Sequence, residues 1–276
     1  MHEDQTAVRR FYETYGWEVG PSGRYRDAEA FVDLRPVMRG YERRLRRRLA
    51  RLLAPDDGGF LDVGCGGDPF SAAAGGGRRV CLDVASAALR GARRDLGPDA
   101  GYVQADVCRL PFPDNALRRV LCAHVLYHLA PQRQRRAIKE IHRVLTDDGV
   151  AVIIYARPSA PLHRLTQRWT RRAAPTAGIA QAAEERPPLP YHPIDYRELC
   201  RELEDRMRIE VSTFAILESA VTRVAVPDNI LGRLLLALVS AVEALLPHLT
   251  LRLARYPMIL IRKRTAEPAR DAVMTE

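Results

Sequence analysis

The stretch FLDVGCGG at residues 60–67 decides the fold class of this chain. A short strand-type run that contains Asp62 leads directly into a glycine-spaced turn, and glycines let the backbone approach a ligand and adopt dihedral angles forbidden to other residues. Asp83 closes the strand-like run 79–82, and Asp106 closes the run 102–105. Acids at the carboxyl ends of successive strands, above a glycine turn, predict a nucleoside pocket in a doubly wound α/β sheet.

A nicotinamide dinucleotide is the rival ligand, because it also uses an acid about 20 residues past the glycines. Its fingerprint needs Gly or Ala at the position that Pro69 occupies here. Asp62 precedes the first glycine, where it would repel a pyrophosphate but would favour an ammonium group. Asp106 supplies an acceptor for an exocyclic adenine amine. The three residues together favour S-adenosylmethionine, a cationic amino-acid nucleoside without phosphates.

Five blocks in order give this chain a family resemblance. Residues 60–157 resemble the class I S-adenosylmethionine-dependent methyltransferases, in particular the ubiquinone/menaquinone-biosynthesis-like branch. The blocks read LDVGCGG at 61–67, CLDVASAAL at 81–89, ADVCRLPFPDN at 105–115, CAHVLYHL at 122–129 and EIHRVLTDDGVAVII at 140–154. One departure is Asp68-Pro69 in place of the third motif glycine, and with the glycines at 75–77 it predicts a stunted helix after the first strand.

The resemblance implies a Rossmann-like sheet of seven strands in the order 3-2-1-4-5-7-6, with the last strand antiparallel. It implies that Gly64 and Gly66 border the methionine moiety, that Asp83 accepts from the ribose hydroxyls, and that Asp106 with the Val107 amide contacts adenine. The full set of implied cofactor residues is Asp62, Gly64, Cys65, Gly66, Asp83, Val84, Asp106, Val107 and His124. S-adenosylhomocysteine would be the product, and no metal is implied.

The chain divides into an expected helical N-terminal lid at 1–55 and a methyltransferase core at 56–276. Helices are predicted around 7–12, 37–53 and 194–206, and the last two strands around 209–217 and 258–262. Insertions at about 158–195, expected to be irregular, and at 219–255 are predicted to form a cap on the acceptor side.

Composition limits the partners. Of 43 basic residues only Lys139 and Lys263 are lysine, and the net charge is +9. The arginines at 43, 44 and 46–48 lie among Leu45, Leu49, Leu52 and Leu53, the pattern of an amphipathic helix with a solvated basic face. No specific nucleic-acid contact is therefore expected. Five cysteines without metal spacing, and no secretory signal at the start, predict a cytoplasmic protein.

The segment 229–255 is almost entirely apolar. Arg233, Glu243 and Pro247 interrupt it, so no transmembrane span is predicted. Three interpretations remain open, in order of preference: a cap or homodimer contact, a wall for a hydrophobic acceptor, and a contact with a membrane surface.

Methyl transfer needs a base only when the acceptor keeps its proton at neutral pH. His124 and His128 follow the fourth strand and are the candidate catalytic bases. Candidate lid or substrate residues are Tyr12, Tyr15, Tyr25, Arg35 and Tyr127. The predicted activity is methyl transfer to a small, hydrophobic or aromatic metabolite. The alternatives are a non-methylating enzyme of rearrangement or cyclisation type that binds the same cofactor, an RNA-modifying methyltransferase, and a degenerate methyltransferase-like partner subunit.

Overall fold

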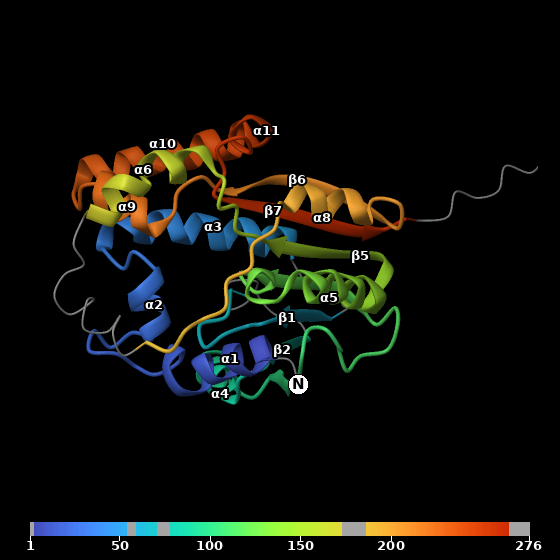
Figure 1. The fold of residues 1–276 in the computed structure, drawn as a ribbon. Helices are drawn as coiled ribbons and strands as arrows, with labels where there is room; N and C mark the ends of the chain where they lie inside the picture. The colour runs from blue at the N-terminus through green and yellow to red at the C-terminus, as the bar shows by residue number, and fades with distance from the viewer. Residues whose placement is uncertain (1–2, 54–58, 71–77, 173–185, 265–276) are drawn as a thin grey trace, which may run out of the picture.

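A computed structural model describes residues 3–53, 59–70, 78–172 and 186–264 (Figure 1). Its centre is a seven-stranded sheet in the order β3-β2-β1-β4-β5-β7-β6. The strands are β1 Phe60–Val63, β2 Arg79–Asp83, β3 Ala100–Gln104, β4 Leu117–Ala123, β5 Leu145–Ile154, β6 Met207–Ala215 and β7 Tyr256–Lys263.

The predicted strand order and the direction of the last strand are both confirmed. Strands β1 to β5 pair in parallel, whereas β7 lies between β5 and β6 and runs antiparallel to both. All carboxyl ends of the parallel strands therefore meet at one edge of the sheet, where the sequence places its acids and glycines.

Alternate residues of the central strands bury opposite faces of the sheet. On β4 and β5, Val120 and Ile153 belong to one hydrophobic cluster and Leu121 and Val152 to another. The first cluster includes residues of α5 (Pro131–Val144) and α8 (Tyr196–Leu203), and the second includes residues of α3 (Arg39–Leu52) and α10 (Ile230–Leu245). A sheet buried on both faces explains why β5 carries the continuous apolar run VAVII.

The N-terminal segment predicted to be a lid folds as short helical pieces. Helix α1 (Glu3–Phe11) continues into a π-helical turn (Tyr12–Gly16), and α2 (Arg26–Phe31) follows after a short connection. A 3-10 turn (Pro36–Met38) leads into α3. Figure 1 shows α1 at the lower edge of the molecule, where α4 (Ser86–Leu96) also lies, and α2 to one side.

The expectation of an irregular insertion at 158–195 is wrong at its start. Helix α6 (Pro161–Arg172) begins on a proline, which is tolerated in the first turn because its missing N–H has no intrahelical acceptor there. No further proline or glycine interrupts the helix before its end. The stunted helix predicted after β1 falls on residues 71–77, outside the described residues.

The segment predicted at 219–255 forms α9 (Ser219–Ala225), α10 and α11 (Pro247–Thr250). The Asn229 side chain caps α10 by accepting from the Gly232 amide at 3.2 Å. Glu243 is buried, and it accepts from the Tyr41 hydroxyl and the Ile216 amide, both at 2.8 Å. Among the described helices, none combines the length and the apolar character that crossing a membrane requires.

Candidate functional site

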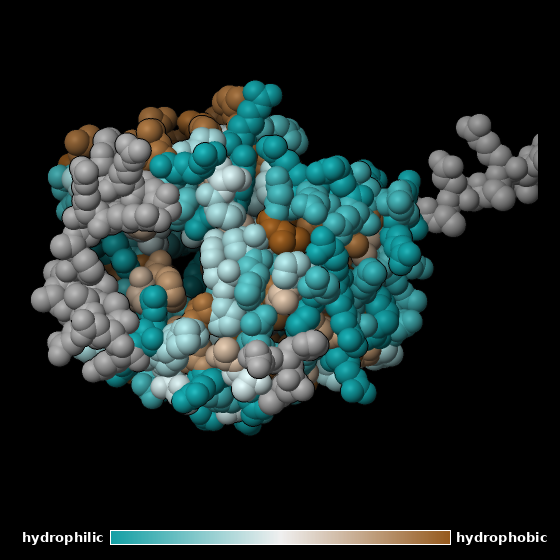
Figure 2. Space-filling model, in the orientation of Figure 1, coloured by the Kyte–Doolittle hydropathy of each residue, from teal (hydrophilic) through white to brown (hydrophobic). Residues whose placement is uncertain are grey.

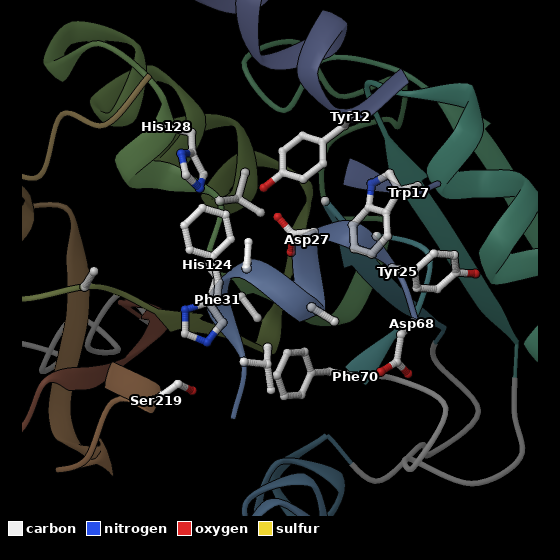
Figure 3. Close-up of a pocket in the computed structure, with 18 of the residues that line it drawn as sticks. Tyr12, Trp17, Tyr25, Asp27, Phe31, Asp68, Phe70, His124, His128 and Ser219 are labelled. Atoms are coloured by element: carbon white, nitrogen blue, oxygen red, sulfur yellow. The ribbon is translucent and has the colours of Figure 1, made fainter. Parts of the chain in front are cut away.

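One cavity of about 1330 Å³ lies at the carboxyl edge of the parallel strands. The ends of β1, β2, β3 and β4 form its floor, and the lid segment, α9 and residues 186–191 contribute its walls. Figure 3 shows aromatic rings and a few charged side chains pointing into this space.

The glycine turn after β1 has the geometry that its sequence predicts. Gly64 and Gly66 both have φ of +66°, in the left-handed region that favours glycine. A side chain on Gly64 would meet Val125, and one on Gly66 would lie 2.6 Å from the Trp17 ring. The turn therefore needs glycine for its conformation and for the close approach of neighbouring groups.

Asp83 is buried at the end of β2 and borders the cavity. Its carboxylate accepts from the Gly66 amide at 3.0 Å and from the Ala85 amide at 2.9 Å, so it links the glycine turn to the start of α4. Burial raises the pKa of this carboxyl to about 6, and the two amide hydrogen bonds oppose the rise.

Asp106 follows β3 and lines the cavity, and both of its carboxylate oxygens accept hydrogen bonds within the protein. It accepts from Gln5 Nε2 at 2.9 Å, from an Arg133 guanidinium nitrogen at 2.7 Å and from the Cys108 amide at 2.9 Å. Gln5 belongs to α1, so this carboxylate also connects the lid to the sheet edge.

The other predicted cofactor residues separate into two groups. Cys65, Val84 and Val107 line the cavity next to the residues above. Asp62 is buried within β1 and is not among the residues that line the cavity. The structure thus brings eight of the nine predicted cofactor residues to one cavity, those eight being Gly64, Cys65, Gly66, Asp83, Val84, Asp106, Val107 and His124.

His124 follows β4 with a positive φ of 64°, which turns the chain away from the sheet. Its ring packs edge-on against Tyr256, with centroids 5.0 Å apart, and lies near Phe70 and Phe214. Burial in this aromatic surrounding lowers the pKa of His124 to about 4, so the ring is neutral at pH 7.

His128 also lines the cavity, and its tautomer follows from one contact. Its Nδ1 lies 2.7 Å from the Pro190 carbonyl oxygen, which can only accept, so Nδ1 carries the proton and Nε2 is the basic nitrogen. Burial lowers the pKa of His128 to about 4, and the Pro190 contact partly opposes this shift.

The candidate lid residues have different roles. The Tyr25 hydroxyl donates to the Gly67 carbonyl at 3.2 Å, which fastens the lid to the glycine turn, and Tyr12 stacks on Trp17 with centroids 5.6 Å apart. Arg35 borders the cavity, but its guanidinium pairs with Asp33 at 2.8 Å and donates to carbonyls of α9 and its end. Tyr127 lines the cavity, whereas Tyr15 is buried and does not.

Sequence reasoning missed several residues of the cavity wall, and two of them, Trp17 and Asp27, come from the N-terminal segment. Trp17 covers Gly66 and Gly67, and its indole Nε1 is buried without a hydrogen-bond partner among the described residues. Asp27 points into the cavity from α2, and in Figure 3 its carboxylate lies between Trp17 and the two histidines. Its Oδ1 likewise has no partner in the described part of the chain, and burial raises the pKa of this carboxyl to about 7.

Neither residue had a distinctive sequence signal. Asp27 occupies the first turn of a short helix, where an acid is ordinarily explained by the helix dipole. Trp17 lies in a stretch without any of the family blocks. A polar side chain that stays unpaired inside a cavity is a candidate ligand contact, and only the folded structure identifies it.

The central part of the chain is similar in sequence to a known protein family. Residues 61–153 match the family model described as a methyltransferase domain. Over these residues the chain is similar to a methyltransferase domain. The ubiquinone/menaquinone biosynthesis C-methyltransferase of Coxiella burnetii (strain RSA 493 / Nine Mile phase I) is 31% identical over 117 residues, which cover 40% of this chain and 46% of that protein. The chain spans about half the length of the curated relatives it matches.

Solved structures agree with the methyltransferase domain in fold. DhpI in complex with S-adenosylhomocysteine has a TM-score of 0.59 at 13% identity, over 96% of this chain and 100% of that chain. Geranyl diphosphate C-methyltransferase from Streptomyces coelicolor A3(2) has a TM-score of 0.54 at 16% identity, over 96% of this chain and 99% of that chain. The chain therefore shares its fold with both of these structures.

Proposed function

We propose that this protein transfers a methyl group from S-adenosylmethionine to a small hydrophobic or aromatic acceptor. The observation that carries the proposal is the convergence of the left-handed glycine turn, Asp83 and Asp106 on one cavity of a methyltransferase domain. The cofactor supplies an activated methyl group on a sulfonium, and the protein supplies the alignment.

The residues at the sheet edge fit such a cofactor. Asp83 is a buried carboxylate suited to accept from two ribose hydroxyls, and Asp106 with the Val107 amide suits the adenine edge. The turn at Gly64 and Gly66 brings backbone without side chains to the cavity, where an amino-acid moiety would lie. The unpaired Trp17 Nε1 borders the same turn and offers a donor to the carboxylate of that moiety.

The acceptor half of the cavity is aromatic. Five aromatic side chains line it, from the segments after β1 and β4, from β6 and β7 and from residues 186–191, and they are Phe70, Tyr127, Phe214, Tyr256 and Tyr191. Ligand pockets usually measure about 300–1,000 Å³, and a cavity of about 1330 Å³ has room for a cofactor and a second small molecule. The Coxiella burnetii relative, whose name describes a C-methyltransferase of quinone biosynthesis, supports an acceptor of this chemical kind.

Two groups are placed to take a proton from the acceptor. In the transfer the acceptor's nucleophilic atom forms a bond to the methyl carbon, the bonding pair returns to sulfur, and any proton on the nucleophile leaves to a base. His128 presents an unprotonated Nε2, and Asp27 presents an unpaired carboxylate oxygen. His124 is enclosed by aromatic rings, so we assign it to packing against the acceptor.

Labelled S-adenosylmethionine with a panel of phenols, quinols and cell-extract metabolites tests the proposal. Label is expected in a small organic product, with S-adenosylhomocysteine formed in equal amount. Asp83→Ala is expected to weaken cofactor binding in calorimetry by tenfold or more, since each charge-assisted hydrogen bond contributes about 1.5–3 kcal/mol. Asp106→Asn, which keeps its size and most of its contacts, is expected to weaken binding less.

The outcome also separates the alternatives. A product that forms without loss of the methyl group would indicate a rearrangement or cyclisation enzyme. Label in tRNA would indicate an RNA-modifying enzyme. Binding of the cofactor by neither the wild type nor Asp83→Ala would indicate a degenerate subunit and would overturn the proposal.

A further inference from the structure

The outer face of α10 and the turn that follows it is a continuous row of exposed apolar side chains. Leu238 and Leu245 expose 62% and 78% of their surface, values typical of polar residues. We call this surface the leucine face, and it comprises Ile230, Leu231, Leu234, Leu235, Leu238, Leu245, Leu246, Leu249 and Leu253. Figure 2 shows a row of hydrophobic side chains along the top of the molecule, where Figure 1 places α10 and α11.

The outward direction of this face is fixed by the polar residues of α10. Glu243 accepts from Tyr41 and from the Ile216 amide, and Arg44 Nε donates to the Ser240 hydroxyl at 3.0 Å. The only acidic residue of the helix and its serine therefore face α3 and β6. Rotating α10 to bury the leucines would leave Glu243 without these partners. The contacts of Glu243 therefore keep the leucines on the outer side of the helix.

Basic side chains flank the leucine face. Arg233 and Arg252 are exposed at its two ends, and Arg43, Arg44 and Arg47 are exposed along the neighbouring α3. Among residues 219–264 the only acids are Asp228 and Glu243. Glu243 is buried, and Asp228 is exposed and accepts from the Val37 amide at 2.9 Å, so one exposed acid in this range stands beside several exposed arginines.

We propose that the leucine face docks on the surface of an anionic lipid bilayer. Leucines bordered by arginines, on a helix too short to span, are the pattern of a helix that lies in the plane of the interface. The sixteen residues of α10 extend about 24 Å, along the bilayer surface. The arginines at both ends then contact lipid phosphates while the leucines enter the acyl boundary.

A second copy of the chain is a poorer occupant of the same face. A two-fold dimer joins identical surfaces, so pairing the leucine faces would bring the arginine flanks of the two copies together. Among residues 219–264 only Asp228 is an exposed acid, and it would oppose several arginines of each copy. A bilayer with anionic headgroups covers the leucines and neutralises the arginines at the same time.

This docking would place the candidate site beside the membrane. Helix α9 directly precedes α10, and its Ser219, Thr222 and Arg223 line the cavity. The inference depends on the exposed face and its charges and does not depend on the reaction that the cavity supports.

Vesicle co-sedimentation tests the proposal with phosphatidylcholine vesicles that contain or lack phosphatidylglycerol. Full-length protein is expected to sediment with the anionic vesicles at least about tenfold more strongly than with the neutral ones. Leu234→Asp with Leu238→Asp should remove binding, and Arg233→Glu with Arg252→Glu should weaken it severalfold. Arg90→Glu with Arg109→Glu makes the same charge change at exposed positions near α4 and β3, and should bind like the wild type.

Circular dichroism and thermal melting accompany each variant, and the exposed positions of the substituted residues predict unchanged folding. If the aspartate pair nevertheless unfolds, Leu234→Ser with Leu238→Ser replaces it. No binding to either vesicle overturns the proposal, as does equal loss in the Arg90/Arg109 control, which indicates general charge attraction. Sedimentation velocity that shows a dimer, dissociated by the leucine substitutions, assigns the face to a second copy instead.

Discussion

Trp17 and Asp27 each contribute a buried polar atom without a partner among the described residues to the cavity wall, and each gives a measurable signal. Trp17 lies on the glycine turn, so its emission should change when S-adenosylhomocysteine fills the neighbouring space. The only other tryptophan is Trp169. Trp17→Phe is expected to abolish the change in fluorescence on titration, and Trp169→Phe is expected to retain it. The reverse result would show that the cofactor does not bind against the glycine turn.

The pH dependence of kcat distinguishes Asp27 from His128 as the group that takes the acceptor proton. Burial raises the pKa of Asp27 to about 7, so its basic form accumulates as pH rises through 7, whereas His128, with a pKa of about 4, is already basic above pH 5. If Asp27 takes the acceptor proton, kcat at saturating cofactor rises through about pH 7. Asp27→Asn should then remove this limb of the profile and lower kcat by about 10²-fold or more.

Asp68→Asn is the matched control, because Asp68 also borders the cavity but pairs with Arg46 at 2.7 Å. It should leave the pH profile unchanged. A limb that survives in Asp27→Asn, together with loss of turnover in His128→Ala, would assign the proton to His128.

Glu13 joins the N-terminal segment, the predicted lid, to helix α4. Helix α4 begins after Ala85, which has no capping side chain, and Glu13 from the π-helical turn fills that role. Its carboxylate accepts from the Ser86 amide at 2.7 Å and from the Ala87 amide at 3.0 Å. These bonds outweigh partial burial and lower the pKa of Glu13. Its stabilisation is therefore present above the unfolded pKa of about 4.5 and is lost as pH falls through the lower folded value.

Glu13→Gln is expected to weaken lid docking by about 1 kcal/mol, the size of a lost helix cap. Hydrogen exchange at the Ser86 and Ala87 amides should accelerate about fivefold as a result. Glu18→Gln removes an exposed glutamate of the same lid, whose side chain lies 3.4 Å from Arg26, and should leave these amides protected. Equal acceleration in both variants would mean that the lid is fastened elsewhere, for example by Tyr25 at Gly67.

Helix α10 shows what sequence can and cannot predict about an element. Its existence and apolar character followed from periodicity, and strand order followed from the family blocks. The sequence did not predict which face of α10 is buried, because Glu243 and Tyr41 are 202 residues apart and only the fold brings them together. The cap was predicted over the acceptor side, yet among the described lining residues it is α9, and no residue of α10, that contributes from this region. Local patterns identify an amphipathic helix, and tertiary partners decide which face is buried.

The same limit applies to the site. The position of Gly64, Gly66, Asp83 and Asp106 at one cavity was predictable because it depends on backbone conformation and on the ends of adjacent strands. Asp27 and Trp17 come from a lid whose position depends on contacts with the glycine turn and α4. The base was assigned to histidines by residue type, while burial lowers the pKa of both to about 4 and raises that of Asp27 to about 7.

The net charge of the whole molecule is +9. Many of the arginines behind this value are paired with carboxylates. Several arginines bind carboxylates within the fold, including Arg133 with Asp106 and Arg255 with Glu218, both at 2.7 Å. The remaining exposed arginines of α3 border a row of leucines, and leucines offer no contact to bases or phosphates. Electrophoretic mobility with tRNA and duplex DNA is therefore expected to show only weak association that disappears at physiological salt, as generic phosphate attraction does. Tight binding that survives that salt and discriminates among sequences would contradict this reading of the charge, and would favour a nucleic-acid acceptor over a small aromatic one.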